Sequence, residues 1–213
     1  MTNLDINEVN KILDQRIKEI FFDKDLNLLT NYEKRKIIFD YVCQKGKYNF
    51  KLLNDISNNK ASRNLISELY AALNEEESIC NGFAGYYKLL LDRLNIYSVC
   101  ICCNDGTNVP HQLNLVKNDD GTYSFDDVTS GIVRKENKDD YFDYDQEDAN
   151  RLGQGKKYIE DTDKYYIIIS IIYDYLGIDI TQYLKHGIES KDGFSYSLPQ
   201  ISSYRKRTNI ISK

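Results

Sequence analysis

Three residues of this chain have the types and the order that nucleophilic catalysis by a thiol requires. A thiol enzyme needs a thiolate, a base within hydrogen-bond reach and a third group that orients the base. The 213 residues include only two histidines and five cysteines, which restricts the choice of base and nucleophile. Cys80 is the one cysteine expected at the N-terminus of a helix, where the helix dipole and free backbone N–H groups favour a thiolate and lower the pKa of a thiol. The same N–H groups can stabilise an oxyanion.

The remaining candidates lie on a predicted β-hairpin. His111 begins an alternating segment, residues 111–117, which is typical of a half-buried strand. Residues 122–129 are predicted to form the returning strand. The base would therefore come from one strand of the hairpin, and the group that orients it from the other.

The turn of the hairpin decides which aspartate lies beside His111. A three-residue turn over residues 119–121, with Gly121 in the last position at positive φ, places Asp127 diagonally next to His111 on the same face. A two-residue turn shifts the pairing by one residue, which turns every side chain to the other face and favours Asp126 instead. The residues alone leave this choice to the turn type.

The elements expected to position these groups are helical in the first part of the chain and β-stranded after it. Apolar residues at three- and four-residue spacings predict helices over residues 4–22, 32–44, 62–73 and 80–94. The polar segment 52–59 predicts a loop or a short helical turn, and residues 96–103 predict a buried strand ahead of the hairpin. Helices followed by an antiparallel hairpin indicate an α+β fold.

The C-terminal third gives a weaker pattern. Residues 131–164 are polar, charged and rich in tyrosine, and predict mainly loop with short elements. Residues 164–176 are expected to form a buried helix, with a strand as the alternative, and residues 179–186 one more helix. The sequence assigns no role to residues 150–213.

The candidate residues lie in segments that resemble a known family. Residues 78–96 place a cysteine at the opening of a helix, followed by small and aromatic residues and a leucine-rich end. This segment resembles the nucleophile helix of the bacterial transglutaminase-like superfamily. His-Gln-Leu-Asn-Leu-Val at residues 111–116 is similar to the His-Ala-Trp-Asn-x-Val strand of that family. Residues 123–129 resemble its Trp-Tyr-x-x-Asp-x-Thr strand, and this resemblance selects Asp127.

The resemblance extends over roughly residues 30–150, with departures at particular positions. The usual glycine before the cysteine is Ser78, and the tryptophan of the histidine strand is Leu113. Transglutaminases often take an oxyanion donor from an aromatic side chain upstream of the cysteine, and Tyr48 is the candidate for that position.

The resemblance implies a papain-like α+β core, in which the helix that begins with Cys80 packs on an antiparallel sheet. It implies an N-terminal helical extension over residues 1–30 and a transglutaminase-like domain over residues 31–213, with its core at about residues 61–150. The implied activity is acyl transfer on peptide or protein amides (hydrolysis, deamidation or transamidation) through a thioester, with Cys80, His111 and Asp127 as the catalytic triad. The alternative is a catalytically inactive relative that binds a peptide or protein in the same groove.

Composition argues against several other classes. The formal charge of −5 disfavours a nucleic-acid binder, and no apolar run approaches the ~18 residues of a membrane span. An odd number of cysteines, three of them within residues 100–103, is no disulfide framework, and with no secretory leader at the first residues we expect a cytoplasmic protein. Cys102 and Cys103 are adjacent and point to opposite faces of a strand, which argues against a metal site. No glycine-rich phosphate loop is present, so we expect no cofactor and disfavour a coenzyme A-dependent acyltransferase.

Overall fold

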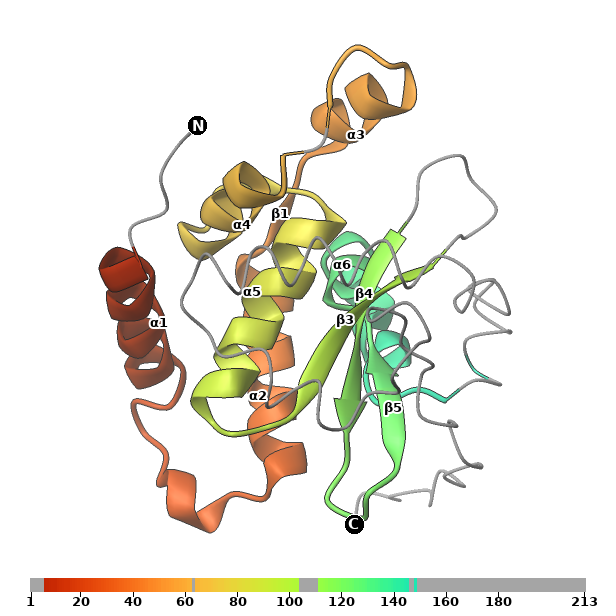
Figure 1. The fold of residues 1–213 in the computed structure, drawn as a ribbon. Helices are drawn as coiled ribbons and strands as arrows, with labels where there is room; N and C mark the ends of the chain where they lie inside the picture. Colours follow the sequence, from red (N-terminus) through yellow and green to blue (C-terminus); the bar gives the residue numbers. More distant parts are fainter. Residues whose placement is uncertain (1–5, 63, 104–110, 146–147, 149–213) are drawn as a thin grey trace, which may run out of the picture.

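The computed structural model describes residues 6–62, 64–103, 111–145 and 148, and within them helices come first and an antiparallel sheet follows (Figure 1). The helical elements are α1 (Ile6–Ile20), η1 (Leu26–Leu28), α2 (Asn31–Lys45), α3 (Phe50–Ser57), α4 (Leu65–Leu73), α5 (Cys80–Arg93), α6 (Val128–Val133) and η2 (Lys135–Tyr141). The strands are β1 (Lys47–Tyr48), β2 (Glu77–Ser78), β3 (Ser98–Cys103), β4 (His111–Lys117) and β5 (Tyr123–Asp126). This order confirms the predicted α+β class.

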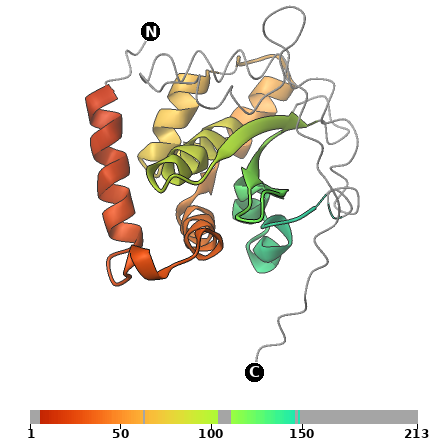
Figure 2. The ribbon, with the colours of Figure 1, turned by 60° about the horizontal axis from the view of Figure 1, so that its bottom comes forward.

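Helix α5 is the central element of the fold. It contacts α1, α2, α4 and α6, and also the strands β3 and β4. Figure 2 shows α1 at the outer edge of the helical part, on the side away from the sheet. Most of the apolar side chains predicted to face the core from this helix are buried, with Tyr87, Leu90 and Leu91 fully inaccessible to solvent. A helix this enclosed holds its first residue in a fixed position relative to the sheet.

A small residue near the start of α5 allows α4 to approach closely. A Cβ atom on Gly82 would lie 2.3 Å from the backbone oxygen of Glu68 in α4 and 2.1 Å from the hydroxyl of Ser78. Glycine costs about 1 kcal/mol relative to alanine in a helix. Close packing between α4 and α5 therefore explains why a glycine occupies this position.

Strands β3, β4 and β5 form an antiparallel sheet in that order. The turn between β4 and β5 has the predicted three residues, because Asn118 N–H donates to Thr122 O at 2.8 Å and Gly121 has a φ of +83°. Glycine adopts this left-handed conformation without a steric cost. The resulting strand register places Asn114 opposite Asp126, as a three-residue turn requires.

The predicted returning strand is too long at its C-terminal end. We expected it to continue to residue 129, but β5 ends at Asp126 and α6 begins at Val128. Asp127 is the N-cap of α6, and its carboxylate accepts a hydrogen bond from the backbone N–H of Ser130 at 2.9 Å. An aspartate at an N-cap stabilises a helix start by about 1 kcal/mol. This local capping outweighs the β propensity of the residues that follow.

Other local predictions also need correction. Residues 50–57 form the helix α3, with Asn49 as its side-chain cap, where we expected a loop or one helical turn. The short parallel pair of β1 and β2 was not anticipated. Ser78, a residue type that often caps helices, does not cap α5: its hydroxyl donates to Glu68 O at 2.7 Å, and Ile79 is the N-cap without a side-chain bond.

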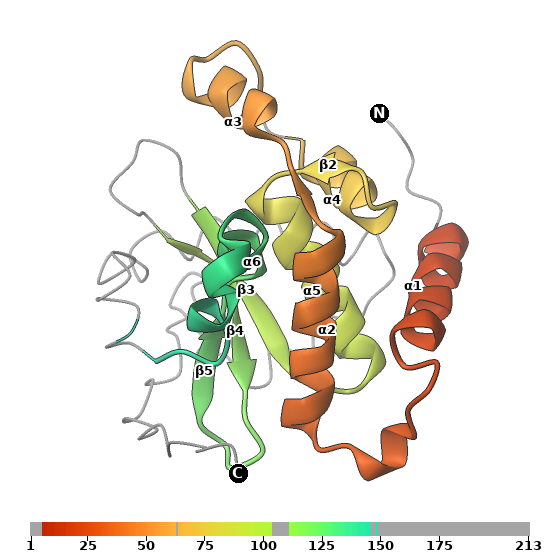
Figure 3. The ribbon, with the colours of Figure 1, turned by 180° about the vertical axis from the view of Figure 1, so that it is seen from behind.

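Helices α2 and α6 lie side by side on one face of the molecule (Figure 3). The α2 helix begins at the capping box formed by Thr30 and Glu33. No helix in the described ranges has the length and apolar character needed to cross a bilayer. The elements predicted for residues 164–176 and 179–186 lie outside the described residues.

Candidate active site

Cys80 is the first residue of α5, as the sequence predicted. The N-cap residue Ile79 makes no side-chain hydrogen bond, so its side chain does not bind the backbone N–H groups at the start of α5. The thiol is buried, with Cys80 only 2% exposed. Its sulfur lies 3.8 Å from Oδ1 of Asn81. The nucleophile candidate is therefore at a helix terminus but enclosed by protein.

His111 is the first residue of β4, and its ring lies between the two other predicted residues. Its Nε2 atom is 2.8 Å from Oδ2 of Asp127, and its side chain is 14% exposed. Cys80 is close enough to the ring to contribute to the raised pKa of His111. Because Asp127 occupies Nε2, the ring nitrogen left for the thiol is Nδ1. The fold thus brings together three side chains that are far apart in sequence.

Asp127 has two structural tasks at once. Its carboxylate is fully buried and is bonded to His111 through Oδ2. The same carboxylate caps α6, since Oδ1 accepts from Ser130 N–H at 2.9 Å and Oδ2 accepts from the Ser130 hydroxyl at 2.7 Å. These bonds hold the carboxylate in the orientation that faces the imidazole.

The electrostatics of this pair favour a charged imidazolium beside a charged carboxylate. Burial by itself lowers the pKa of His111, but the charge and hydrogen bond of Asp127, with a further contribution from Cys80, raise it well above 6.5. Burial by itself raises the pKa of Asp127, but His111 and the two bonds from Ser130 lower it below 3.8. Each partner thus stabilises the charged form of the other.

Two other cysteines, Cys43 and Cys100, lie in different surroundings. Cys43 and Cys100 are as buried as Cys80, at 1% and 2% exposure. The sulfur of Cys43 faces Val128 O at 3.7 Å, and that of Cys100 faces Ala84 O at 3.4 Å. Burial raises the pKa of the Cys43 thiol. These two thiols are natural internal controls for the reactivity of Cys80.

Asn81 is a residue of this site that sequence reasoning missed. Its side-chain oxygen is next to the Cys80 sulfur, and its Nδ2 atom is buried with no hydrogen-bond partner among the described residues. A buried amide donor without a partner costs about 1–3 kcal/mol, so its place beside the thiol calls for an explanation. The only signal in the sequence is its position directly after the cysteine.

Tyr48 lies near the start of α5 through the pairing of β1 with β2. It is paired with Ser78, and the backbone N–H of Asn49 donates to Ser78 O at 2.8 Å. Its half-buried ring packs edge-to-face on Phe50, with 4.8 Å between the ring centroids. Its role as an oxyanion donor stays a prediction.

Comparison with known proteins gives a fold assignment. No family model matches the chain, and no curated protein matches it. Among solved structures, one described as the crystal structure of a TGase matches with a TM-score of 0.53 and 18% sequence identity. The match covers 62% of this chain and 35% of that one, so the chain corresponds to about a third of the other protein. The likeness shows a transglutaminase-like α+β fold.

Proposed function

We propose that this chain is a cysteine-dependent acyl-transfer enzyme that acts on peptide or protein amides, with Cys80 as nucleophile, His111 as base and Asp127 as the group that orients the base. The observation that carries this proposal is the 2.8 Å contact between His111 Nε2 and Asp127 Oδ2, supported by the contribution of Cys80 to the raised pKa of the same ring. A nucleophile, a base and an orienting acid in this order form the arrangement that thiol catalysis needs.

In the proposed reaction, the Cys80 thiolate attacks the carbonyl carbon of the amide while the imidazolium of His111 holds the proton taken from the thiol. The oxyanion that forms is stabilised by backbone N–H groups at the N-terminus of α5 and by the Asn81 Nδ2 donor. When the intermediate collapses, the carbon–nitrogen bond breaks and His111 protonates the leaving amine. Water or a second amine then attacks the thioester and regenerates the thiol.

One observation favours a second candidate, an inactive relative that binds a peptide or protein. Cys80 is only 2% exposed, and a nucleophile must be reached by its substrate. In a binding module the thiol would be a small apolar side chain of the core, as buried cysteines commonly are. The two candidates differ in the reactivity of the thiol and not in the fold.

Alkylation with iodoacetamide at about pH 6 distinguishes the enzyme from the binding module. Peptide mass spectrometry then gives the extent of reaction at each cysteine. An ordinary thiol is only about 0.3% ionised at this pH, so a thiolate stabilised by an imidazolium gains at most ~300-fold in rate. Because a more stable thiolate is also a weaker nucleophile, we expect Cys80 to react about 10- to 100-fold faster than Cys43 and Cys100. Since the three are similarly buried, access alone does not produce this difference.

The variant His111→Ala should remove the advantage of Cys80 while leaving the rates of Cys43 and Cys100 unchanged. If Cys80 reacts no faster than Cys43 in the unsubstituted protein, the enzyme proposal is wrong and the binding module is the better description. If Cys80 is faster but His111→Ala has no effect, the assignment of the base is wrong.

A further inference from the structure

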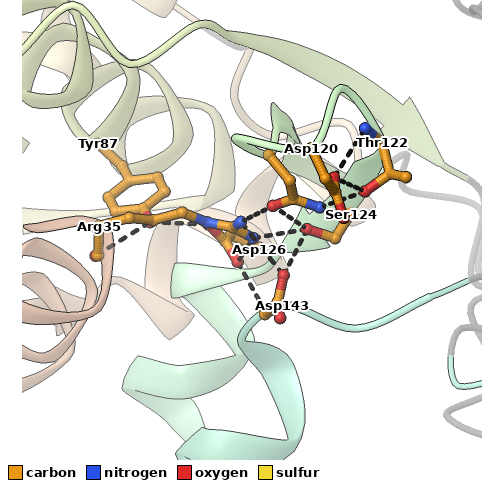
Figure 4. Close-up of polar contacts among 8 residues, drawn as sticks. Arg35, Tyr87, Asp120, Thr122, Ser124, Asp126 and Asp143 are labelled. Carbon is orange, nitrogen blue, oxygen red and sulfur yellow. Dashed lines mark hydrogen bonds and ion pairs between the residues drawn. The ribbon is translucent and has the colours of Figure 1, made fainter. Parts of the chain in front are cut away.

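A buried arginine on α2 is bound to the residue that precedes Asp127. The side chain of Arg35 is 2% exposed and that of Asp126 is fully buried. They form a bidentate pair, with Arg35 Nε 2.5 Å from Oδ2 and Nη2 2.6 Å from Oδ1 (Figure 4). Paired N–H donors on a carboxylate fix its orientation as well as its position.

All the hydrogen-bonding positions of the guanidinium are occupied. A guanidinium has five N–H donors, and two of them go to Asp126. The others go to Asn118 Oδ1 at 2.7 Å, Asp143 Oδ1 at 3.2 Å and the Ser124 hydroxyl at 2.9 Å. The pKa of Arg35 is raised because the Asp126 carboxylate outweighs the effect of burial. Arg35 thus stays charged and connects α2 to the turn and strand of the hairpin.

The carboxylate of Asp126 is saturated in the same way. Besides the two bonds from Arg35, its Oδ2 accepts from the Tyr87 hydroxyl at 2.8 Å and its Oδ1 accepts from Asp143 N–H at 2.8 Å. Tyr87 belongs to α5, the helix that carries Cys80. A buried polar network in which each member is satisfied allows one arrangement only.

Burial of this ion pair costs desolvation free energy, so a gain in stability is by itself a weak explanation for the network. Buried ion pairs are often neutral or unfavourable relative to apolar side chains of similar size, because both charges lose their hydration. Here the pair fixes the last residue of β5, directly before the change from strand to the α6 cap. Asp127 is the next residue, and its N–H donates to Tyr141 O at 2.9 Å.

We propose that Arg35 is a positioning residue, whose guanidinium holds Asp126 so that the neighbouring Asp127 carboxylate stays in contact with the His111 ring. This inference rests on the proposed function, since it assigns Arg35 a part in the orientation of the base. It adds to the site a residue that contacts neither substrate nor thiol.

A positioning role and a purely electrostatic one predict opposite effects of Arg35→Met on the imidazole. Loss of a nearby positive charge favours the imidazolium and raises the pKa of His111, or leaves it unchanged if Asp126 takes up a proton. If the Asp127 carboxylate is no longer held in place, it moves away from the ring, and the pKa of His111 falls. A fall in the pKa of His111 is therefore specific to the positioning role.

The test measures the titration of His111 by NMR in histidine-labelled protein, with His186, the second histidine, in the same spectrum. The main variant is the double change Arg35→Met with Asp126→Asn, because it removes both charges of the fully buried pair, while Asp143, which is 14% exposed, keeps its bond from the Ser124 hydroxyl. We expect the pKa of His111 to fall in this variant and in Arg35→Met. We also expect the alkylation rate of Cys80 at about pH 6 to drop by up to about 100-fold, as for a misplaced catalytic group.

The matched control is Arg16→Met, which removes another arginine with ion-pair partners, here Glu19 and Glu75. It should change stability without changing the titration of His111. If the double variant is folded and His111 titrates as in the unsubstituted protein, the positioning role is overturned while the proposed function stands. If the unsubstituted protein shows no raised His111 pKa and no fast Cys80, the proposed function itself fails.

A milder variant covers the case in which the double variant does not fold. Tyr87→Phe removes one of the four bonds to the Asp126 carboxylate and retains the ion pair. We expect a smaller fall of the His111 pKa in the same direction, and an unchanged titration in this variant also overturns the proposal.

Discussion

The two tasks of Asp127 can be separated by one substitution, and this gives a sharp prediction. Asp127→Asn keeps an oxygen that accepts from Ser130 N–H, and asparagine is as good an N-cap as aspartate. It removes the negative charge that faces His111. Asp127→Ala removes both the charge and the cap, so the comparison of the two variants isolates each contribution.

The size of the effect follows from the burial of the pair. Removal of one partner of a buried ion pair costs about 3–5 kcal/mol, and loss of an N-cap costs about 1 kcal/mol more. With its oxygen kept on Ser130 N–H, the amide presents its NH2 group to the imidazole and can donate to the neutral ring, so we expect about 3 kcal/mol of lost stability for Asp127→Asn and about 4–5 kcal/mol for Asp127→Ala. A domain of this kind has a total stability of about 5–15 kcal/mol, so both losses are measurable.

The loss must depend on pH in a defined way. The raised pKa of His111 contributes stability that is complete below the unfolded value near 6.5 and disappears as the pH rises through the folded value. The lowered pKa of Asp127 contributes stability that is complete above the unfolded value near 3.8 and disappears as the pH falls through the folded value. Both contributions are therefore fully present only between about pH 4 and pH 6.5, and Asp127→Asn should cost most in that window.

Urea denaturation followed by circular dichroism at about pH 5.5 and about pH 10 measures this difference. The control is Asp25→Asn, an aspartate that caps η1 through Asn27 N–H and, within the described part of the chain, pairs with no histidine. We expect the control to lose a similar small amount of stability at both pH values. A loss for Asp127→Asn that is equal at the two pH values, or larger at the higher one, would refute the charged-pair description.

Two further predictions concern the first turn of α5. Asn81→Ala should slow acyl transfer from a peptide amide about tenfold, because a hydrogen-bond donor to a charged group such as the oxyanion contributes about 1.5–3 kcal/mol; an unchanged rate would show that Asn81 Nδ2 does not act on the oxyanion. Gly82→Ala should lower the stability by about 1–3 kcal/mol in thermal or urea unfolding, since its Cβ would lie 2.3 Å from the backbone oxygen of Glu68. Gly85→Ala meets only a flexible side-chain atom at 3.2 Å and should be neutral or stabilising, so equal losses at the two glycines would contradict the packing argument.

The hairpin illustrates how far local sequence rules reach. The turn with Gly121 at a φ of +83° is a local structure, and once it is known the strand register follows from chain connectivity. That register put Asp127, rather than Asp126, on the side of His111, and the two carboxylates do face different partners. The start of α5 at Cys80 was predictable for the same reason, because helical spacing is a property of neighbouring residues.

Competition between local preferences was harder to predict. Residues 127–129 have a sequence that suits a strand, and the outcome depends on whether the Asp127 carboxylate finds the Ser130 N–H group. Ser78 is a good capping residue by type, but its hydroxyl is bonded to Glu68 O, which comes from another helix. A residue that has two suitable partners cannot be assigned until the positions of both are known.

The sequence by itself determined the class of fold and the chain order of the candidate nucleophile, base and acid, and the three-residue turn seen in the structure then settled which aspartate lies on the side of His111. Only the tertiary structure decided that Arg35 and Asp126, 91 positions apart, form one buried network beside the candidate site. It also decided that the thiol is enclosed, with Cys80 at 2% exposure. The physical reason is that periodicity and turn chemistry are local, whereas burial and charge pairing depend on which surfaces meet when the whole chain folds.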